Sequence, residues 1–336
     1  MALPVEGIGA RRLAAFKAFA APTLPRLVVT SRRARALGLE VSEPVAITLN
    51  GTDDSETLDV LVAAVAAPRP LEAKPASAPA RAAITLAKFA QRLPALLVTE
   101  ADASGYADPP LVSVDAESIA RFRRSVLQSL AIASEAQVPL HGGHSTRFVV
   151  FRDAIGGSSV AVVVGKPDFS KPVPVRLHSA CLTGDVFGSR RCDCGDQLKL
   201  ALARLDEAGG GVILYLEQEG RGVGLVNKMR AYQLQDGGLD TVDANTTLGF
   251  DDDERDYGVA ARMLKMLGCT RVRLLTNNPA KVDSLAGAGI DVTGRLPLYT
   301  PINADNRRYL TAKLKRAGHR LDHLVAEAGK AESDRP

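Results

Sequence analysis

Residues 196–216 read Asp-Gln-Leu-Lys-Leu-Ala-Leu-Ala-Arg-Leu-Asp-Glu-Ala-Gly-Gly-Gly-Val-Ile-Leu-Tyr-Leu and predict a helix, a stop and a strand in succession. The leucines at 198, 200, 202 and 205 mostly fit a helical face. The three glycines at 209–211 end the helix, because glycine is a poor helix former. The apolar run that follows is typical of a buried strand. A helix joined so closely to a buried strand indicates a fold that mixes both element types.

The segments on either side of this helix and strand repeat the mixture. Residues 148–151 and 160–164 predict a β-hairpin, and residues 272–276 predict a further strand. A helix is expected over 254–267, because the acidic run Asp251-Asp-Asp supplies capping side chains and suits the helix dipole. This order of elements predicts an α+β or α/β fold for the larger part of the chain.

The first 130 residues are rich in alanine and predict a smaller α/β domain. β-branched runs at 26–30, 45–49 and 96–99 indicate strands, and the stretches 67–70 and 74–80, rich in proline and alanine, indicate a loop or hinge. We therefore expect an N-terminal domain at 1–130, a second domain at 131–325 and a disordered tail at 326–336.

Composition excludes several classes of protein. The chain has 336 residues, in which 42 Lys and Arg balance 38 Asp and Glu, so a basic nucleic-acid-binding lobe and a polybasic membrane anchor are not expected. No apolar run approaches the ~20 residues of a membrane helix. Lys17 interrupts the apolar stretch near the N-terminus before it reaches the length of a signal peptide. We expect a cytoplasmic protein that binds neither nucleic acid nor membrane.

Three of the four cysteines, Cys181, Cys192 and Cys194, are clustered. Four cysteines are too few for a disulfide scaffold in a chain of this length, and a cluster in a reducing compartment more often binds metal. Three protein ligands would leave the fourth position of zinc to water, which is the catalytic arrangement. His178 could instead complete a structural site. The spacing alone leaves catalytic zinc, structural zinc and no metal as alternatives.

Three further features are suited to bind an anion. The segment Glu217-Gln-Glu-Gly-Arg-Gly-Val-Gly-Leu is glycine-rich and precedes a predicted helix, and Thr276-Asn-Asn-Pro-Ala-Lys joins a strand to a helix. Arg255 is expected at a helix start, where a cation is unfavourable unless an anion lies nearby. Each feature alone could be an ordinary connection or cap. Beside three thiolates, they predict a phosphorylated substrate and zinc-assisted hydrolysis.

Several motifs occur in a fixed order over about residues 131–325. They are Arg176-Leu-His-Ser-Ala-Cys-Leu-Thr-Gly-Asp, Cys192-Asp-Cys-Gly-Asp-Gln, Gln218-Glu-Gly-Arg-Gly-Val-Gly-Leu, Asn227-Lys-Met-Arg-Ala-Tyr, Leu248-Gly-Phe, Asp253-Glu-Arg-Asp and Leu275-Thr-Asn-Asn-Pro. As a set they resemble the GTP cyclohydrolase II family, which opens riboflavin biosynthesis. The resemblance implies that this segment is a mixed-sheet α+β domain and that the protein is a homodimer.

The resemblance also implies an activity. Family members convert GTP and water to formate, pyrophosphate and 2,5-diamino-6-ribosylamino-4(3H)-pyrimidinone 5′-phosphate, using Zn²⁺ and Mg²⁺. By resemblance, Cys181, Cys192 and Cys194 hold one zinc ion per chain, whose water attacks C8 of the guanine, and Mg²⁺ accompanies the GTP phosphates. Tyr232 matches a catalytic tyrosine and Asp253 a proton acceptor. The positions that match GTP contacts are Arg176, Leu177, His178, Ser179, Ala180, Gln197, Glu219, Gly220, Arg221, Thr241, Thr276 and Lys281.

Arg255 matches the residue that the family uses as a nucleophile on the α-phosphate. A guanidinium with a pKa above ~12 is a poor nucleophile. A charge clamp on the same phosphate would use this side chain more easily. The sequence leaves both roles open.

Two departures from the family pattern concern Ala180 and the N-terminal domain. Many family members have Glu where Ala180 stands, so a contact there would come from the backbone only. Bifunctional relatives carry an upstream 3,4-dihydroxy-2-butanone 4-phosphate synthase domain with an acidic metal-binding loop followed by Glu-Gly-Asp, and residues 1–130 lack that loop. Their nearest acidic cluster, at residues 52–56, is expected to be a solvated turn. We expect this domain to be non-catalytic and to pack on the cyclohydrolase domain.

Two alternative functions remain at this point. A paralogue could stop at the formamidopyrimidine or act on another nucleotide, although Tyr232 fits the complete reaction. A non-catalytic, zinc-stabilised nucleotide-binding regulator would have no need for Tyr232, Asp253 and Arg255 together. Release of formate separates these alternatives from the complete reaction.

Overall fold

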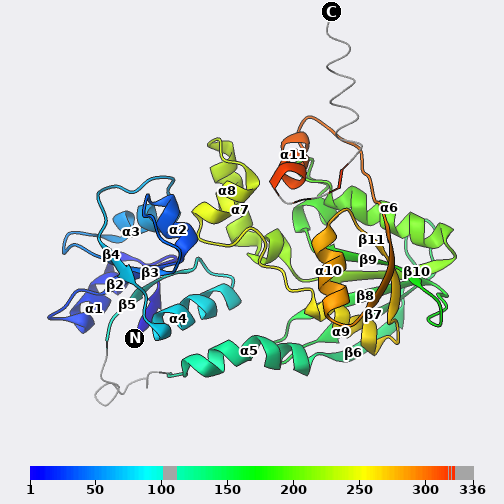
Figure 1. Cartoon of the computed structure of the whole chain (residues 1–336), viewed down its shortest axis with the longest axis horizontal. Helices are drawn as coiled ribbons and strands as arrows, with labels where there is room; N and C mark the ends of the chain where they lie inside the picture. Colours follow the sequence, from blue (N-terminus) through cyan, green and yellow to red (C-terminus); the bar gives the residue numbers. More distant parts are fainter. Residues whose placement is uncertain (101–111, 317, 319, 322–336) are drawn as a thin grey trace, which may run out of the picture. The chain divides into compact units, whose positions relative to one another are not determined.

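The chain forms two sheets with helices packed on them (Figure 1). Among the residues that the structure describes, no helix is both long enough and apolar enough to cross a membrane. The expected tail at 326–336 lies outside the described residues. The computed structural model describes residues 1–100, 112–316, 318, 320 and 321.

Two compact units share the chain, and neither is a continuous segment. Unit 1 comprises Met1–Arg123 and Val223–Glu254, and unit 2 comprises Arg124–Gly222 and Arg255–Pro336. The helix α5 (Ala116–Ser129) contains the first boundary. This division differs from the continuous domains expected from the sequence, because 32 residues of the family-like region belong with the N-terminal part.

Unit 1 is built on a five-stranded antiparallel sheet in the order β1-β5-β2-β3-β4. Successive side chains alternate between its faces, so Leu27 packs on one face and Val28 on the other. The strands are β1 (Ala2–Pro4), β2 (Arg26–Val29), β3 (Val45–Thr48), β4 (Ala73–Pro75) and β5 (Ala95–Val98), and the helices are α1 (Ala10–Ala20), α2 (Ser31–Ala36), α3 (Ser55–Ala63), α4 (Ala78–Phe89), α7 (Leu225–Asp236) and α8 (Thr241–Thr247).

Two expectations for the N-terminal region are only partly right. Residues 67–70 lie outside helices and strands, as expected. Residues 74–80 were also expected to be a loop or hinge, but they contain the end of β4 and the start of α4, whose first turn tolerates the proline and is capped by Ser77. The acidic cluster at 52–56 was expected to be solvated, and Asp54 and Glu56 are exposed. The Asp53 carboxylate is instead buried and lies 2.6 Å from the guanidinium of Arg69.

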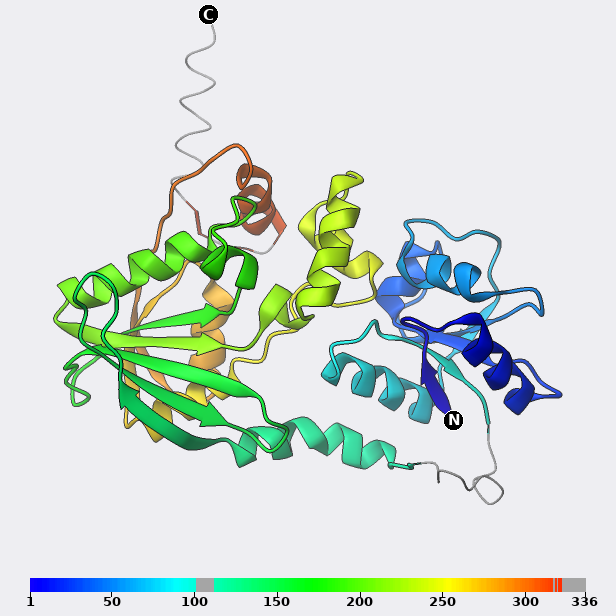
Figure 2. The ribbon, with the colours of Figure 1, turned by 180° about the vertical axis from the view of Figure 1, so that it is seen from behind.

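Unit 2 contains a mixed seven-stranded sheet in the order β12-β11-β9-β10-β8-β7-β6 (Figure 2). The first four are mutually parallel and the last three pair antiparallel, including the predicted hairpin of β7 and β8. The strands are β6 (Ala131–Gln137), β7 (Thr146–Arg152), β8 (Ser158–Gly165), β9 (Val173–Ser179), β10 (Gly210–Leu216), β11 (Arg271–Leu275) and β12 (Asp291–Leu296), and the remaining helices are α6 (Cys194–Glu207), α9 (Gly258–Met266), α10 (Pro279–Gly287) and α11 (Arg307–Arg316).

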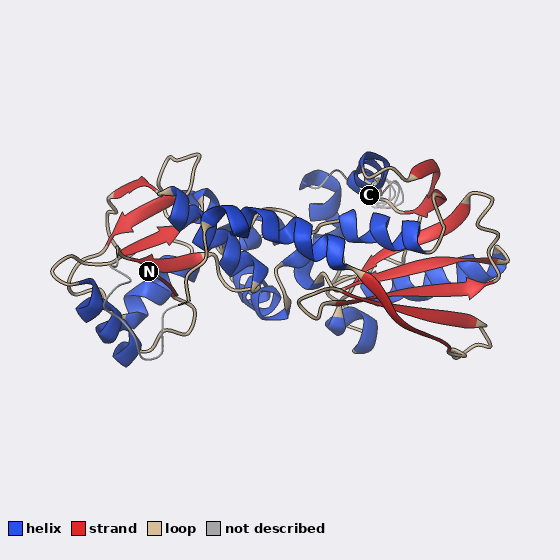
Figure 3. Ribbon diagram, turned by 90° about the horizontal axis from the view of Figure 1, so that it is seen from below, coloured by secondary structure: helices blue, strands red, loops and turns tan. Residues whose placement is uncertain are grey.

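Helices cover both faces of the seven-stranded sheet (Figure 3). Leucine and alanine side chains of α6 pack on one face, and those of α9 and α10 pack on the other. The helix expected from residue 254 begins only at Gly258. The Asp256 carboxylate accepts the N–H of Gly258 at 2.8 Å, so it caps the first free N–H of this helix. Residues 253–255 lie in an irregular segment before the helix.

Candidate active site

The three clustered cysteines lie where β9 ends and α6 begins. Cys181 follows β9, and Cys192 and Cys194 lie at the start of α6. Their sulfur atoms all lie within 4.8 Å of one another, and the Cys181 and Cys192 sulfurs are 3.7 Å apart. Contact with the Cys181 sulfur and burial raise the pKa of Cys192 to about 11 and also raise that of Cys194. A bound cation would reverse this effect, because it stabilises thiolates.

Space beside the sulfurs is kept open by Gly184, in the π-helical turn Leu182–Val186. A Cβ atom at this position would lie 2.8 Å from the sulfur of Cys192 and 3.1 Å from that of Cys181. The donor set and the free space therefore fit a tetrahedral thiophilic ion such as zinc, with one position left open.

Asp185 holds the loop that carries the first cysteine. Its carboxylate accepts the N–H of Cys181 at 2.9 Å and the hydroxyl of Tyr215 at 2.9 Å, and it lies 3.1 Å from Nε2 of His178. His178 therefore contacts a carboxylate and does not belong to the group of three sulfur ligands. A closed structural zinc site would need His178 as its fourth ligand, and the structure does not place it there. Burial lowers the pKa of His178, so the imidazole is neutral at pH 7.

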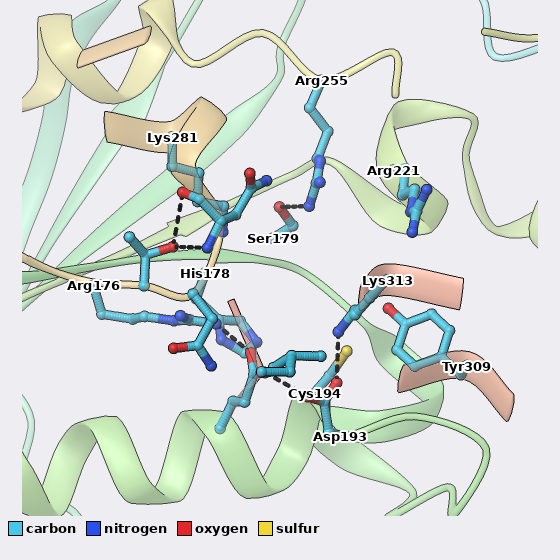
Figure 4. A pocket seen from close by; sticks show the side chains of 15 residues that line it. Arg176, His178, Ser179, Asp193, Cys194, Arg221, Arg255, Lys281, Tyr309 and Lys313 are labelled. Carbon is cyan, nitrogen blue, oxygen red and sulfur yellow. Dashed lines mark hydrogen bonds and ion pairs between the residues drawn. The ribbon is translucent and has the colours of Figure 1, made fainter. Parts of the chain in front are cut away.

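A cavity next to Cys194 is strongly cationic (Figure 4). It encloses about 620 Å³ including space open to solvent, and all of its lining residues belong to unit 2. Such a concentration of guanidinium and ammonium groups is suited to a polyphosphate. Its cationic side chains are Arg176, Arg221, Arg255, Lys281 and Lys313.

Neighbouring groups fix three of these cations. One Nη of Arg176 donates to the carbonyl of Leu275 at 3.0 Å and the other to the side chain of Gln197. Arg255 donates to the hydroxyl of Ser179 at 3.3 Å. The ammonium of Lys281 donates to a backbone carbonyl of β9 at 2.8 Å. The strand end therefore meets the start of α10 and the segment before α9 at one cavity.

Comparison with known proteins accounts for this arrangement. The family model described as GTP cyclohydrolase II matches residues 131–297, which contain the three cysteines and four of the five cavity cations. A protein named GTP cyclohydrolase-2 from Azotobacter vinelandii is 50% identical over 196 residues, which cover 58% of this chain and 94% of that protein. The chain belongs to the GTP cyclohydrolase II family. It is therefore a hydrolase of riboflavin biosynthesis.

Two longer relatives, also named GTP cyclohydrolase-2, match part of the N-terminal region as well. The protein from Xylella fastidiosa strain Temecula1 is 42% identical over 301 residues, which cover 88% of this chain and 75% of that protein. The protein from Azospirillum brasilense is 49% identical over 245 residues. These residues cover 71% of this chain and 64% of that protein.

Within this family member, the structure brings most of the predicted site residues together. Leu177 is an exception, because its side chain is buried in the core of unit 2 and only its carbonyl reaches Lys281. Ala180 uses its N–H to bind the carbonyl of Leu216, and its side chain does not line the cavity. The predicted residues that line the cavity are Arg176, His178, Ser179, Cys194, Gln197, Arg221, Arg255, Thr276 and Lys281.

The glycine-rich segment forms a tight turn at Glu219–Gly222. Gly220 and Arg221 have φ near +65°, a conformation that glycine adopts easily and arginine rarely. The Glu219 carboxylate accepts the N–H of Leu182 at 2.6 Å, so this turn supports the loop after Cys181. Tyr232, Thr241 and Asp253 belong to unit 1, on α7, at the start of α8 and in the segment that follows α8.

A buried ion pair in the cavity was not predicted from the sequence. Lys313, on α11, lies 2.8 Å from the carboxylate of Asp193, and Thr300 and Gln197 also contact that carboxylate. Burial disfavours the charge on Asp193, but Lys313 outweighs this effect and lowers its pKa. In the sequence, Asp193 could have been noticed because it lies between the candidate metal ligands Cys192 and Cys194. Lys313 could not, because it belongs to an amphipathic helix in which lysines are common.

Proposed function

We propose that this chain is a zinc-dependent GTP cyclohydrolase II that converts GTP and water to 2,5-diamino-6-ribosylamino-4(3H)-pyrimidinone 5′-phosphate, formate and pyrophosphate. The observation that carries the proposal is the position of three clustered thiols beside a cavity with five cationic side chains. A polyphosphate and a hydrolytic metal are the two requirements of this reaction, and one site of unit 2 is suited to both.

The metal site would be formed by Cys181, Cys192 and Cys194. Zinc bound there would supply a water of near-neutral pKa for hydrolysis. The chain itself fixes the ligands: Asp185 holds the backbone of Cys181, and Glu219 holds the next residue of the same loop. These hydrogen bonds limit movement of the loop that carries Cys181, so this ligand would need little reorganisation to bind the metal.

The triphosphate would be bound by the cavity cations, together with Mg²⁺. Arg176 and Lys281 are buried and already oriented by backbone carbonyls, so they need little reorganisation to receive an anion. Arg255 is half-buried and lies between Ser179 and the ring of Tyr257, 5.5 Å from the ring centroid. A guanidinium held in this way acts as a clamp on the α-phosphate.

Proton transfer would be the task of two residues from unit 1. By family resemblance, Tyr232 donates or accepts a proton near the zinc, and Asp253 accepts a proton. The same resemblance supports Thr241 as a further contact to GTP and a homodimeric assembly. These four assignments rest on the motifs rather than on the geometry of unit 2, and a cytoplasmic location rests on the composition of the chain.

The test is incubation of the zinc- and magnesium-loaded protein with GTP, followed by quantification of formate, pyrophosphate and the pyrimidine product. We expect equimolar formate and pyrophosphate, and loss of formate in Cys192→Ser. The matched control is Cys269→Ser, because Cys269 is buried in the core of unit 2 away from the cluster. Pyrophosphate without formate would contradict ring opening, and GTP binding without either product would support the regulatory alternative.

A further inference from the structure

We propose that residues 1–123 act as a platform that positions the segment Val223–Glu254 for catalysis, and that Arg33 is its main positioning residue. The proposal rests on the proposed function, because Tyr232 and Asp253 are the residues that we assign to proton transfer. Both lie in the segment that leaves unit 2 after Gly222 and returns to it at Arg255. The activity of that site would then depend on a region with no predicted chemistry of its own.

The segment contributes to the main hydrophobic core of unit 1. Ala231 of α7 and Ala244 of α8 are buried in the same cluster as Leu27 of β2 and Leu61 of α3. Phe250, after α8, is 1% exposed in that cluster. Apolar burial of this extent stabilises the segment only while the N-terminal sheet is present, since the other side of the cluster comes from residues 1–123.

Arg33 joins this segment to the N-terminal helices. Its side chain is 1% exposed, and its guanidinium donates to the carbonyl of Thr247 at 2.8 Å, at the last residue of α8. It also donates to carbonyls of Val60, Leu61 and Ala64, at distances of 2.6–2.9 Å, where α3 ends. One buried cation therefore binds carbonyls at the negative dipole ends of two helices.

Further contacts fix both ends of the segment. At α7, Arg230 donates to the carboxylate of Glu6 at 2.7 Å. Before Asp253, the ammonium of Lys88 lies 3.1 Å from the carboxylate of Asp251, and beyond Asp253 it lies 2.5 Å from that of Glu254. The backbone that carries Asp253 is therefore held on both sides by one lysine of the platform.

The first experiment compares Arg33→Gln with the wild type and with Arg35→Gln, an exposed arginine on the same helix. Amide hydrogen exchange over residues 225–247 should become at least tenfold faster in Arg33→Gln, while exchange in β9 and the metal content per chain stay unchanged. The kcat for formate release should fall at least tenfold, and Arg33→Lys should recover part of it. Faster exchange over 225–247 with unchanged kcat would overturn the proposal.

A double-mutant cycle separates positioning from a general loss of stability. If Arg33 acts through Tyr232, Tyr232→Phe should reduce kcat much less in the Arg33→Gln background than in the wild type. Independent, multiplicative losses would overturn the proposal.

Lys88→Gln gives a second variant that keeps the core intact, in case Arg33→Gln fails to fold. We expect kcat to fall about threefold to tenfold with little change in KM, whereas the exposed Lys74→Gln control should match the wild type. An unchanged kcat in Lys88→Gln would count against the platform. Wild-type protein that releases no formate would instead reject the proposed function, and the exchange measurement would still report whether Arg33 orders the segment.

Discussion

The ammonium of Lys313 lies 2.8 Å from the carboxylate of Asp193, and both groups are buried in unit 2. Asp193 stands between two of the metal-binding candidates, so this ion pair ties α11 to the start of α6. Loss of one partner leaves an uncompensated buried charge. We expect Lys313→Met to lower the free energy of unfolding by about 3 kcal/mol, measured by urea denaturation.

The control for this prediction is Lys315→Met, an exposed lysine on the same helix, which should change the free energy of unfolding by less than about 0.5 kcal/mol. Equal stability of Lys313→Met and Lys315→Met would show that the buried pair does not contribute.

Metal binding should be sensitive to a single methyl group at Gly184. A Cβ there would lie 2.8 Å from the sulfur of Cys192, closer than Cβ atoms approach other heavy atoms that are not bonded to them. We expect Gly184→Ala to reduce zinc affinity at least tenfold, measured by competition with a chromogenic chelator. Gly287→Ala is the matched control, because a Cβ at Gly287 meets no atom within 4 Å. Unchanged zinc affinity in Gly184→Ala would contradict the assigned metal position.

The buried His178 predicts a pH dependence of stability. Burial lowers its pKa in the folded protein, while the unfolded chain keeps a value near 6.5. The unfolded state therefore binds the proton first, and folding stability falls as the pH drops below about 6.5 and toward the folded-state pKa. Each pH unit in this window removes about 1.4 kcal/mol from the free energy of unfolding.

This dependence is measured by urea denaturation between pH 7 and pH 5, in the wild type and in His178→Gln. In His178→Gln, the free energy of unfolding should lose the part of its pH dependence that His178 contributes. In His141→Gln, a change in an exposed loop, the pH dependence should stay as in the wild type. A wild-type slope in His178→Gln would assign the pH dependence to other groups.

Arg255→Lys distinguishes the two roles considered for this residue. A clamp needs only positive charge near the α-phosphate, so lysine should retain measurable pyrophosphate release, at roughly one tenth to one hundredth of the wild-type rate. A guanidinium nucleophile cannot be replaced by lysine in the same geometry. Complete loss of pyrophosphate release, with GTP affinity preserved, would favour the covalent role.

Much of the fold could be predicted because it depends on local patterns. The strand at 212–216, the helix before it and the hairpin of β7 and β8 follow from apolar periodicity and glycine stops, which act over a few residues. The start of α9 could not be predicted in this way. Several aspartates precede it, and only the folded backbone decides that Asp256 accepts the first N–H.

The sequence by itself determined the family and the metal-binding candidates, because the cysteines and the motif residues are chemical identities that do not depend on neighbours in space. Tertiary structure decided which distant residues hold the metal-binding candidates and the catalytic segment in place. Asp193 and Lys313 are 120 residues apart and pair only because the fold brings α11 to the start of α6. Likewise, Arg33 meets the end of α8 across 214 residues, because a buried cation must find carbonyls wherever the fold leaves them unpaired. Contacts of this kind leave no periodic signal in the sequence.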